Sequence, residues 1–189
     1  MLQLRKGGHR DLERYYTLFE VDFDEKELLP KLGLHTAISK GDAELLIVYD
    51  EESRIEVAYA LCFCRGLYGY VLLKHFGVLP WYRNKGLGVQ AMRLVNQHYA
   101  EKQGILAELA VFDPEDRETL RKLRKFFARF GYEKVAVDYR LAGAEAELLV
   151  KPIKGTADLA PVAHRIVRDL YGRVLSPAAT DQMVQIARR

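Results

Sequence analysis

The chain has 189 residues, a length that fits one domain with an appendage. Hydrophobic residues make up 49% and charged residues 29% of it, ordinary values for a soluble globular protein. The formal net charge of +3 is too small to indicate nucleic-acid binding. No apolar run is long enough to span a bilayer, and charged residues interrupt the opening segment, so we expect no membrane span and no signal peptide. A cytoplasmic location is the default expectation.

Two cysteines, Cys62 and Cys64, lie two residues apart in a strand-like run, so both side chains would share one face of that strand. A disulfide between such neighbours would be strained, and two cysteines alone argue against zinc. We therefore expect two small apolar residues in a sheet, and no bound metal.

The first half of the chain predicts a strand, a helix, a second helical stretch and three further strands. Short turns of acidic residues or glycines separate the three strands, which indicates an antiparallel meander. Apolar residues at helical spacing define the first helix. The expected ranges are 2–6 for the first strand, about 10–20 for the helix, 25–39 for the helical stretch (interrupted near Pro30 and Gly33), and 43–49, 55–65 and 70–78 for the strands.

The next segment, 78–88, connects a strand to a helix and reads VLPWYRNKGLG. Gly86 and Gly88 allow a tight turn and a close approach of the backbone to a ligand. The free N–H groups of the following helix would face this turn and form an anion site suited to a phosphate. Arg83 and Lys85 add positive charge.

The second half predicts a helix over 88–103 that stops at Gly104, a strand over 105–112, a helix that ends at Gly131, and strands over 133–140 and 146–151. Asp113, Pro114 and Asp116 supply the start signals of the second of these helices. Residues 153–189 predict two amphipathic helices, the second with Met183, Val184 and Ile186 on its apolar face.

Arg83, Gly86 and Gly88 resemble the acyl-CoA pyrophosphate loop of the GCN5-related N-acetyltransferases. Residues 126–132, FFARFGY, resemble the helix end and Gly-aromatic turn late in that fold. The resemblance implies an α/β (α+β) fold over residues 1–152, with a mixed, mostly antiparallel central sheet flanked by helices. Residues 153–189 would then be a C-terminal helical extension, docked on the core or across a homodimer interface, which does not supply the acetyl-transfer groups.

The same resemblance implies transfer of an acetyl group from acetyl-CoA to a primary amine of a small molecule or peptide, by direct transfer in a ternary complex. The backbone amide of Val78 would stabilise the oxyanion. An alternative is a CoA-binding regulatory module with little or no turnover. The expected cofactor-binding residues are Val78, Arg83, Asn84, Lys85, Gly86, Leu87, Gly88 and Val89.

Glu108 is our candidate for the general base, because a glutamate in the middle of an apolar strand is costly to bury without a function. The alternative is a structural ion pair with Arg121 or Arg124. Some family members place a glutamate or histidine base on the strand before the loop. The matching positions here carry Leu72 and Lys74, and neither is an obvious base.

Many relatives place a proton-donating tyrosine where this chain has Phe127, and phenylalanine cannot donate a proton. Water, Tyr139 or Tyr70 could replace it, although packing is the favoured role for any one tyrosine. Strand alternation places His75 on the face opposite Lys74, as a core histidine. Gly77 permits either a local bulge or close packing.

Acidic residues gather at the end of the first helix and the start of the second helical stretch. They could attract a cationic amine, or they could form a solvated surface. They are Glu20, Asp22, Asp24, Glu25 and Glu27.

Overall fold

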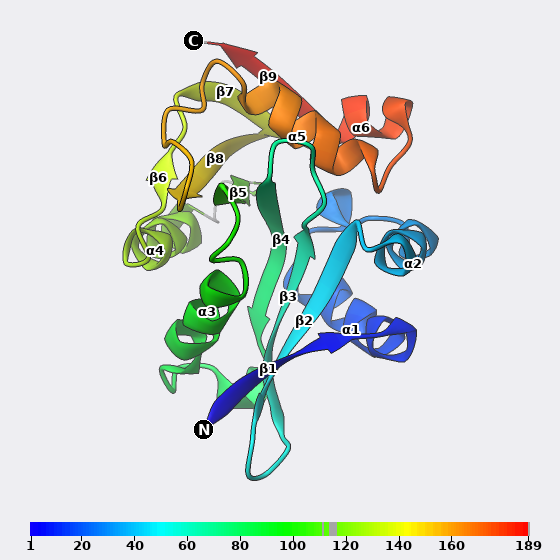
Figure 1. Cartoon of the computed structure of the whole chain (residues 1–189), viewed down its shortest axis with the longest axis vertical. Helices are drawn as coiled ribbons and strands as arrows, with labels where there is room; N and C mark the ends of the chain where they lie inside the picture. Colours follow the sequence, from blue (N-terminus) through cyan, green and yellow to red (C-terminus); the bar gives the residue numbers. More distant parts are fainter. Residues whose placement is uncertain (111, 114–116, 189) are drawn as a thin grey trace.

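The computed structural model describes residues 1–110, 112–113 and 117–188. Within these residues, nine strands form one sheet in the order β1-β2-β3-β4-β5-β8-β7-β9, with β6 paired to β8 (Figure 1). Neighbouring strands run antiparallel except β4 and β5, which run parallel. The predicted mixed, mostly antiparallel sheet flanked by helices is confirmed.

The elements follow the predicted order, with changes at several ends. They are β1 (Leu2–Gly7), α1 (His9–Asp22), η1 (Glu25–Glu27), α2 (Lys31–Lys40), β2 (Ala43–Asp50), β3 (Glu56–Phe63), β4 (Tyr70–Val78), η2 (Pro80–Tyr82), α3 (Leu87–His98), β5 (Gly104–Ala110), α4 (Arg117–Ala128), β6 (Glu133–Lys134), β7 (Val137–Leu141), β8 (Ala144–Pro152), α5 (Ala163–Gly172), α6 (Pro177–Met183) and β9 (Val184–Arg188).

Several predicted boundaries were wrong. Gly104 opens β5 and does not stop a helix, because α3 already ends at His98. Gly33 lies inside α2, and the strand predicted over 133–140 is divided between β6 and β7. Asp113 is described, but the predicted start signals Pro114 and Asp116 lie outside the described residues.

The C-terminal extension also differs from its prediction. Val184 and Ile186, which we expected in a helix, lie in β9, which pairs with β7. Two β-branched residues separated by Gln185 suit a strand, and β7 offers backbone groups for pairing at the sheet edge. The extension thus completes the sheet as well as adding helices.

Helices cover both faces of the sheet (Figure 1). One core lies between the sheet and α1, α2 and α5, and another lies between the sheet and α3 and α4. Alternate residues of β4 enter different cores, with Leu72 on the α1 face and Leu73 on the α3 face. Cys62 and Cys64 are buried on the α3 face as free thiols, as predicted.

A β-bulge at Lys74 interrupts this alternation. Leu73 pairs with Cys62 on β3, and His75 pairs with the adjacent Leu61, so Lys74 is an extra residue on β4. A bulge of this kind bends the strand and increases its twist. It also changes which face each later residue of β4 occupies.

The prediction that His75 points away from the face of Lys74 is therefore wrong. The His75 ring packs against Phe19 of α1 and against Phe23, the residue after that helix, with ring centroids 5.2 and 4.1 Å apart. Burial, and then the charge of Lys74, lower the pKa of His75 well below its usual value. His75 is a neutral core residue on the α1 face.

Gly77 is required for close packing, the second of the two roles that we considered for it. A Cβ at this position would lie 2.4 Å from Cζ of Tyr59, so a larger residue cannot fit while that ring is in place. The bulge that we considered for Gly77 lies at Lys74 instead.

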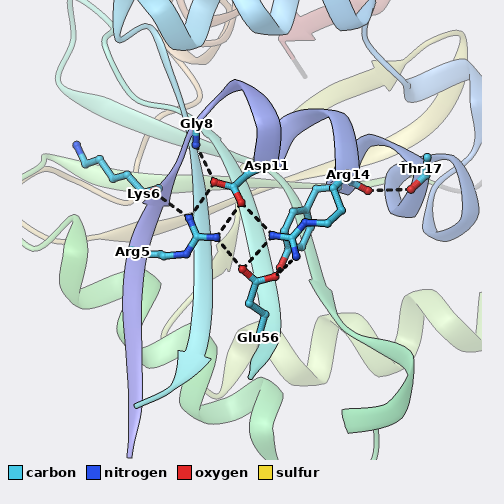
Figure 2. A network of polar contacts seen from close by, with 8 residues as sticks. Arg5, Lys6, Gly8, Asp11, Arg14, Thr17 and Glu56 are labelled. Atoms are coloured by element: carbon cyan, nitrogen blue, oxygen red, sulfur yellow. Dashed lines mark hydrogen bonds and ion pairs between the residues drawn. The ribbon is translucent and has the colours of Figure 1, made fainter. Parts of the chain in front are cut away.

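A network of ions fixes α1 to the sheet (Figure 2). Asp11 of α1 and Glu56 of β3 share the two cations Arg5 and Arg14, and the Tyr15 hydroxyl donates to Glu56 at 2.9 Å. Arg5 holds the pKa of Asp11 well below its usual range. Partial burial raises the pKa of Glu56. Hydrogen bonds from Arg14, Arg5 and Tyr15 lower this pKa by a larger amount, so its net shift is downward.

Replacing Glu56 with Gln should lower the free energy of unfolding by about 1 kcal/mol at pH 7, because Arg5 and Arg14 lose a partly buried counter-charge. A depressed folded-state pKa contributes stability above the pKa of the unfolded group, and this contribution is lost as pH falls. In urea denaturation, the difference from wild type should therefore shrink below about pH 4. Glu118→Gln, in an exposed pair with Arg121, is the control and should change little. Equal effects of both substitutions would contradict the assigned role of the network.

Candidate active site

The strands β4 and β5 lie side by side only at their starts. Their parallel pairing joins Tyr70–Leu73 to Gly104–Ala107. Beyond these ranges β4 stays with β3 as far as Val78, while β5 stays with β8 as far as Ala110. The two strands therefore separate toward their carboxyl ends, and we call the gap in pairing between residues 74–78 and 108–110 the opening.

The end of β4 directs a backbone amide toward this opening. The Leu79 N–H donates to the Val57 carbonyl of β3 at 2.9 Å. Because N–H groups of successive strand residues point to opposite sides, the Val78 N–H points toward the side that β5 has left. The Val78 carbonyl, on the same side, accepts a hydrogen bond from Arg83 Nε at 2.9 Å. The Val78 N–H therefore lies on the side of β4 that faces the opening, and its oxyanion role stays a prediction.

The loop after β4 sets the start of α3 beside the end of that strand. Asn84 and Gly86 have φ values of 61° and 73°, and Gly86 is the residue before the first turn of α3. No side chain in the described part of the chain caps this helix start. A Cβ on Gly88 would lie 3.2 Å from Val78 Cγ2, so Gly88 lets the helix approach the strand. A helix start without a side-chain cap can bind an anion through its backbone N–H groups.

Arg83 is partnered by the protein itself. Its guanidinium contacts Asp22 at the end of α1 at 2.6 Å, and Asp22 also accepts a hydrogen bond from the Tyr59 hydroxyl at 2.8 Å. Lys85 Nζ lies 5.4 Å from the centroid of the Tyr82 ring. The Arg83 side chain therefore fastens the loop to α1, a role that its spacing from the glycines did not indicate.

Lys74 of β4 and Glu108 of β5 are the first residues after the paired ranges, and they form a buried ion pair. Lys74 Nζ lies 3.3 Å from Glu108 Oε2, and the two side chains are 0% and 2% exposed. The alternative partners that we considered for Glu108 are wrong, since Arg121 binds Glu118 and Arg124 binds Glu147. The counter-charge of Glu108 comes from the strand from which β5 separates.

Two tyrosine hydroxyls donate to the same carboxylate. Tyr139 of β7 donates to Glu108 Oε1, and Tyr171 of α5 donates to Glu108 Oε2 at 2.7 Å. Burial, and then the charge of Glu108, raise the pKa of both hydroxyls well above the usual value. The two predicted catalytic residues thus contact each other, whereas Tyr70 lies at the paired start of β4. Sequence reasoning missed Tyr171, which adjoins the apolar stripe of its helix and carries no distinguishing spacing.

Glu27 of η1 extends this cluster toward the surface. Its Oε2 lies 3.6 Å from Lys74 Nζ, and its side chain is 15% exposed. Burial raises the pKa of Glu27 above its usual value, and Lys74 opposes part of this shift. Among the other acidic residues predicted nearby, Asp22 binds Arg83 and Asp24 caps η1.

The two adjacent phenylalanines of α4, Phe126 and Phe127, have different surroundings. Phe127, at the position expected for a tyrosine, is 6% exposed and packs against Tyr132 with ring centroids 5.0 Å apart. Its neighbour Phe126 stacks on Phe76 of β4 and lies 4.0 Å from the position of a Cβ on Gly88. Phe126 is thus nearer to the loop than Phe127, and neither ring can donate a proton.

A basin of about 920 Å³ lies between α4 and the strands β7, β8 and β9. Tyr139 and Leu109 contribute to its lining, together with charged residues of both signs. None of the predicted cofactor-binding residues lines it. The basin is therefore separate from the loop but reaches the tyrosine that binds Glu108.

The described residues contain neither a membrane-spanning helix nor a cluster of metal-binding side chains. No helix in that part of the chain is both long and apolar enough to cross a membrane. No three His, Cys, Asp or Glu side chains gather there in a way that could hold a metal ion.

Residues 41–134 match the sequence profile of the acetyltransferase (GNAT) domain. This range contains β2 to β5, the loop with Gly86 and Gly88, and α4. The chain belongs to the GCN5-related N-acetyltransferase (GNAT) family. No curated protein matches the sequence significantly.

Solved structures share the fold at low sequence identity. A protein assigned to the GNAT family from Bacteroides thetaiotaomicron is 17% identical, with a TM-score of 0.69 over 90% of this chain and 98% of that one. NAA60 of Arabidopsis thaliana, solved with a bisubstrate analogue, is 14% identical, with a TM-score of 0.62 over 82% and 100%. Mutant forms of the spermidine/spermine N-acetyltransferase SpeG from Vibrio cholerae are 12% identical, with a TM-score of 0.60 over 80% and 95%.

Replacing Lys74 with Met should destabilise the protein by about 3 kcal/mol at pH 8, because Glu27 and Glu108 lose their buried counter-charge. Protonation of either carboxylate relieves this loss, so the deficit relative to wild type should become smaller at pH 5. Adding Glu108→Gln to Lys74→Met should restore part of the stability. Chemical denaturation at both pH values measures these differences.

The matched control for this prediction is Lys154→Met. Lys154 pairs with Glu101 at the surface and is 51% exposed, so its replacement should have little effect. If Lys74→Met were as stable as Lys154→Met at both pH values, Lys74 would not carry the charge balance of the cluster.

Proposed function

We propose that this protein is an acetyl-CoA-dependent N-acetyltransferase that acetylates a primary amine by direct transfer in a ternary complex. One observation carries the proposal: the opening between β4 and β5 begins at the buried Glu108–Tyr139 pair and ends at the uncapped start of α3. An anion-binding helix start and a pair of groups able to exchange a proton thus share one opening.

The residues of the loop fit the phosphates of acetyl-CoA. Gly86 holds the left-handed backbone, and a Cβ at this position would meet no atom within 4 Å, so the backbone there is approachable. The N–H groups of Leu87 and Gly88 would bind the pyrophosphate, with Asn84 and Lys85 beside it. The Val89 N–H instead donates to the Gly86 carbonyl at 3.2 Å, which closes the first turn of the helix. The Val78 N–H would stabilise the oxyanion that forms on the thioester carbonyl. Acetyl-CoA supplies the activated acetyl group.

Glu108 and Tyr139 would carry the proton transfers. As the amine nitrogen bonds to the carbonyl carbon and the carbon–sulfur bond breaks, nitrogen must lose a proton and sulfur must gain one. Glu108 takes the first, directly or through a water, and Tyr139 gives the second from its hydroxyl. Their mutual hydrogen bond then returns the proton from Glu108 to Tyr139, and both groups end as they began.

The hydrogen bond between Tyr139 and Glu108 would also control when Tyr139 gives up its proton. Besides burial, the negative charge of Glu108 raises the pKa of the Tyr139 hydroxyl. Once Glu108 has taken a proton this charge is gone, and the hydroxyl becomes the stronger acid when sulfur needs the proton.

The acceptor is a small-molecule or peptide amine in this proposal. The cluster holds two carboxylates, Glu27 and Glu108, against one ammonium, Lys74, which favours a cationic amine approaching from η1. Structures with the same fold include a spermidine/spermine N-acetyltransferase and an enzyme solved with a bisubstrate analogue. No step requires a metal, and buried free thiols at Cys62 and Cys64 fit a reducing compartment such as the cytoplasm.

A second candidate is a CoA-binding module with little turnover. The phenylalanines at 126 and 127 favour it, since neither can protonate the leaving thiolate. Binding of CoA without release of thiol from acetyl-CoA across a panel of amines would support this candidate over the first.

Acetyl-CoA and CoA should each raise the melting temperature, because a ligand that binds only the folded state stabilises it. ATP and NAD at equal concentration should do much less.

Gly86→Val should weaken acetyl-CoA binding by more than about tenfold in isothermal titration. A valine there is strained at positive φ and places a side chain at the helix start.

Gly41→Val is the control for the backbone strain. Gly41 has the same φ of 73° and an equally open Cβ position, but it ends α2. Both variants should lose similar stability, while only Gly86→Val should lose affinity. A clear shift with ATP or NAD but none with CoA would refute the proposed ligand.

Glu108→Gln and Tyr139→Phe should each lower kcat by about 10²-fold, because each removes one group of the proton-transfer pair. The dissociation constant for acetyl-CoA should stay near the wild-type value in both. Tyr132→Phe, which removes a buried hydroxyl bound to Asn96, is the control and should keep its kcat. Wild-type kcat in both Glu108→Gln and Tyr139→Phe would exclude this pair from the reaction.

A further inference from the structure

We infer that the C-terminal extension is part of the catalytic centre, through Tyr171, which positions the Glu108 carboxylate for proton transfer. This inference rests on the proposed function. The sequence predicted that the extension covers the core without supplying acetyl-transfer groups. In the structure it supplies no group that would react, but it holds one in place.

The two oxygens of Glu108 have different partners. Oε2 receives the Tyr171 hydroxyl at 2.7 Å and the Lys74 ammonium at 3.3 Å, whereas Oε1 receives the Tyr139 hydroxyl. Rotation of the carboxylate would break all three contacts. Tyr171 therefore fixes the orientation in which Oε1 faces the proton donor.

Tyr171 is itself held rigidly. Its side chain is fully buried, its ring meets the edge of Phe63 with centroids 5.4 Å apart, and Lys74 Nζ lies 5.7 Å from its centroid. The helix α5 that carries it packs on β4 and β9. Asp169 of the same helix accepts a hydrogen bond at 2.6 Å from the Leu67 N–H, in the turn before β4. The extension is thus fixed to β4, the strand that borders the opening, by packing and by a hydrogen bond.

Four titratable groups face or adjoin the Glu108 carboxylate. Tyr139 comes from β7, Tyr171 from α5 and Lys74 from β4, and Glu27 of η1 faces the pair across Lys74. Removing the Tyr171 hydroxyl takes one donor from the charged form and leaves the other three groups in place. The carboxylate then has one hydrogen-bond donor fewer, and its orientation is less fixed.

The test is Tyr171→Phe in the full chain, assayed with acetyl-CoA and an amine that the wild type acetylates. We expect kcat to fall about ten- to a hundredfold, with the acetyl-CoA dissociation constant unchanged. We also expect the acidic limb of the kcat/KM pH profile to move to higher pH. A merely structural role would leave this limb where it is.

Tyr99→Phe is the matched control. Tyr99 is 3% exposed and donates to the carboxylate of Glu44 at 2.9 Å, far from the opening on the α3 face. It should keep the wild-type kcat and pH profile. A double-mutant cycle of Tyr171→Phe with Glu108→Gln, measured by urea denaturation, should be non-additive, because the two side chains share a hydrogen bond.

The outcomes separate the inference from the proposed function. Wild-type kcat and pH profile in Tyr171→Phe, with an active wild type, would overturn the inference alone. An additive double-mutant cycle would overturn it as well, without any need for turnover. A wild type that binds CoA but acetylates no amine would overturn the proposed function, and the catalytic role of Tyr171 with it.

Discussion

The buried contact between Lys74 and Glu108 stands at the point where β4 and β5 stop pairing, and the other features of the site depend on it. Taking two charges out of water costs several kcal/mol for each ion unless further polar groups surround them. Here two tyrosine hydroxyls and the carboxyl group of Glu27 complete the cluster. A hydrophobic pair would fill the same space, but it could not move a proton. Charge at this position is therefore consistent with the proton transfer that we propose.

The bulge at Lys74 links this cluster to the rest of β4. By adding one residue against β3 it places both Lys74 and His75 on the α1 face, and it reverses the faces of the residues that follow. Val78 then packs on the α3 face beside Gly88, where the helix can approach closely. The strand thus presents a buried charge at one end of the opening and a backbone amide at the other. Without the bulge, His75 and the residues after it would point to the opposite faces of the sheet.

The helix α1 connects the predicted acceptor side to the loop. Its first turn is fixed to the sheet by the ions around Glu56, and its last residue, Asp22, binds both Tyr59 and Arg83. Displacement of α1 would therefore disturb the loop that precedes α3. This arrangement gives a physical route by which contacts on the α1 face affect the proposed acetyl-CoA site, since one rigid helix carries both attachments.

The sequence alone determined the features that depend on neighbours along the chain. A strand-like run after a glycine turn placed β4 at residues 70–78, the glycines marked the start of α3, and the cost of burying a charge singled out Glu108. Only the tertiary structure decided which partners these residues have. The face of His75 depends on the register of β4 against β3, and the strand at Val184 depends on the edge of β7. Tyr171 reaches Glu108 across 63 residues of chain. Periodicity reports local backbone preference, whereas register, edge pairing and the choice of a buried counter-charge are set by contacts between segments far apart in the sequence.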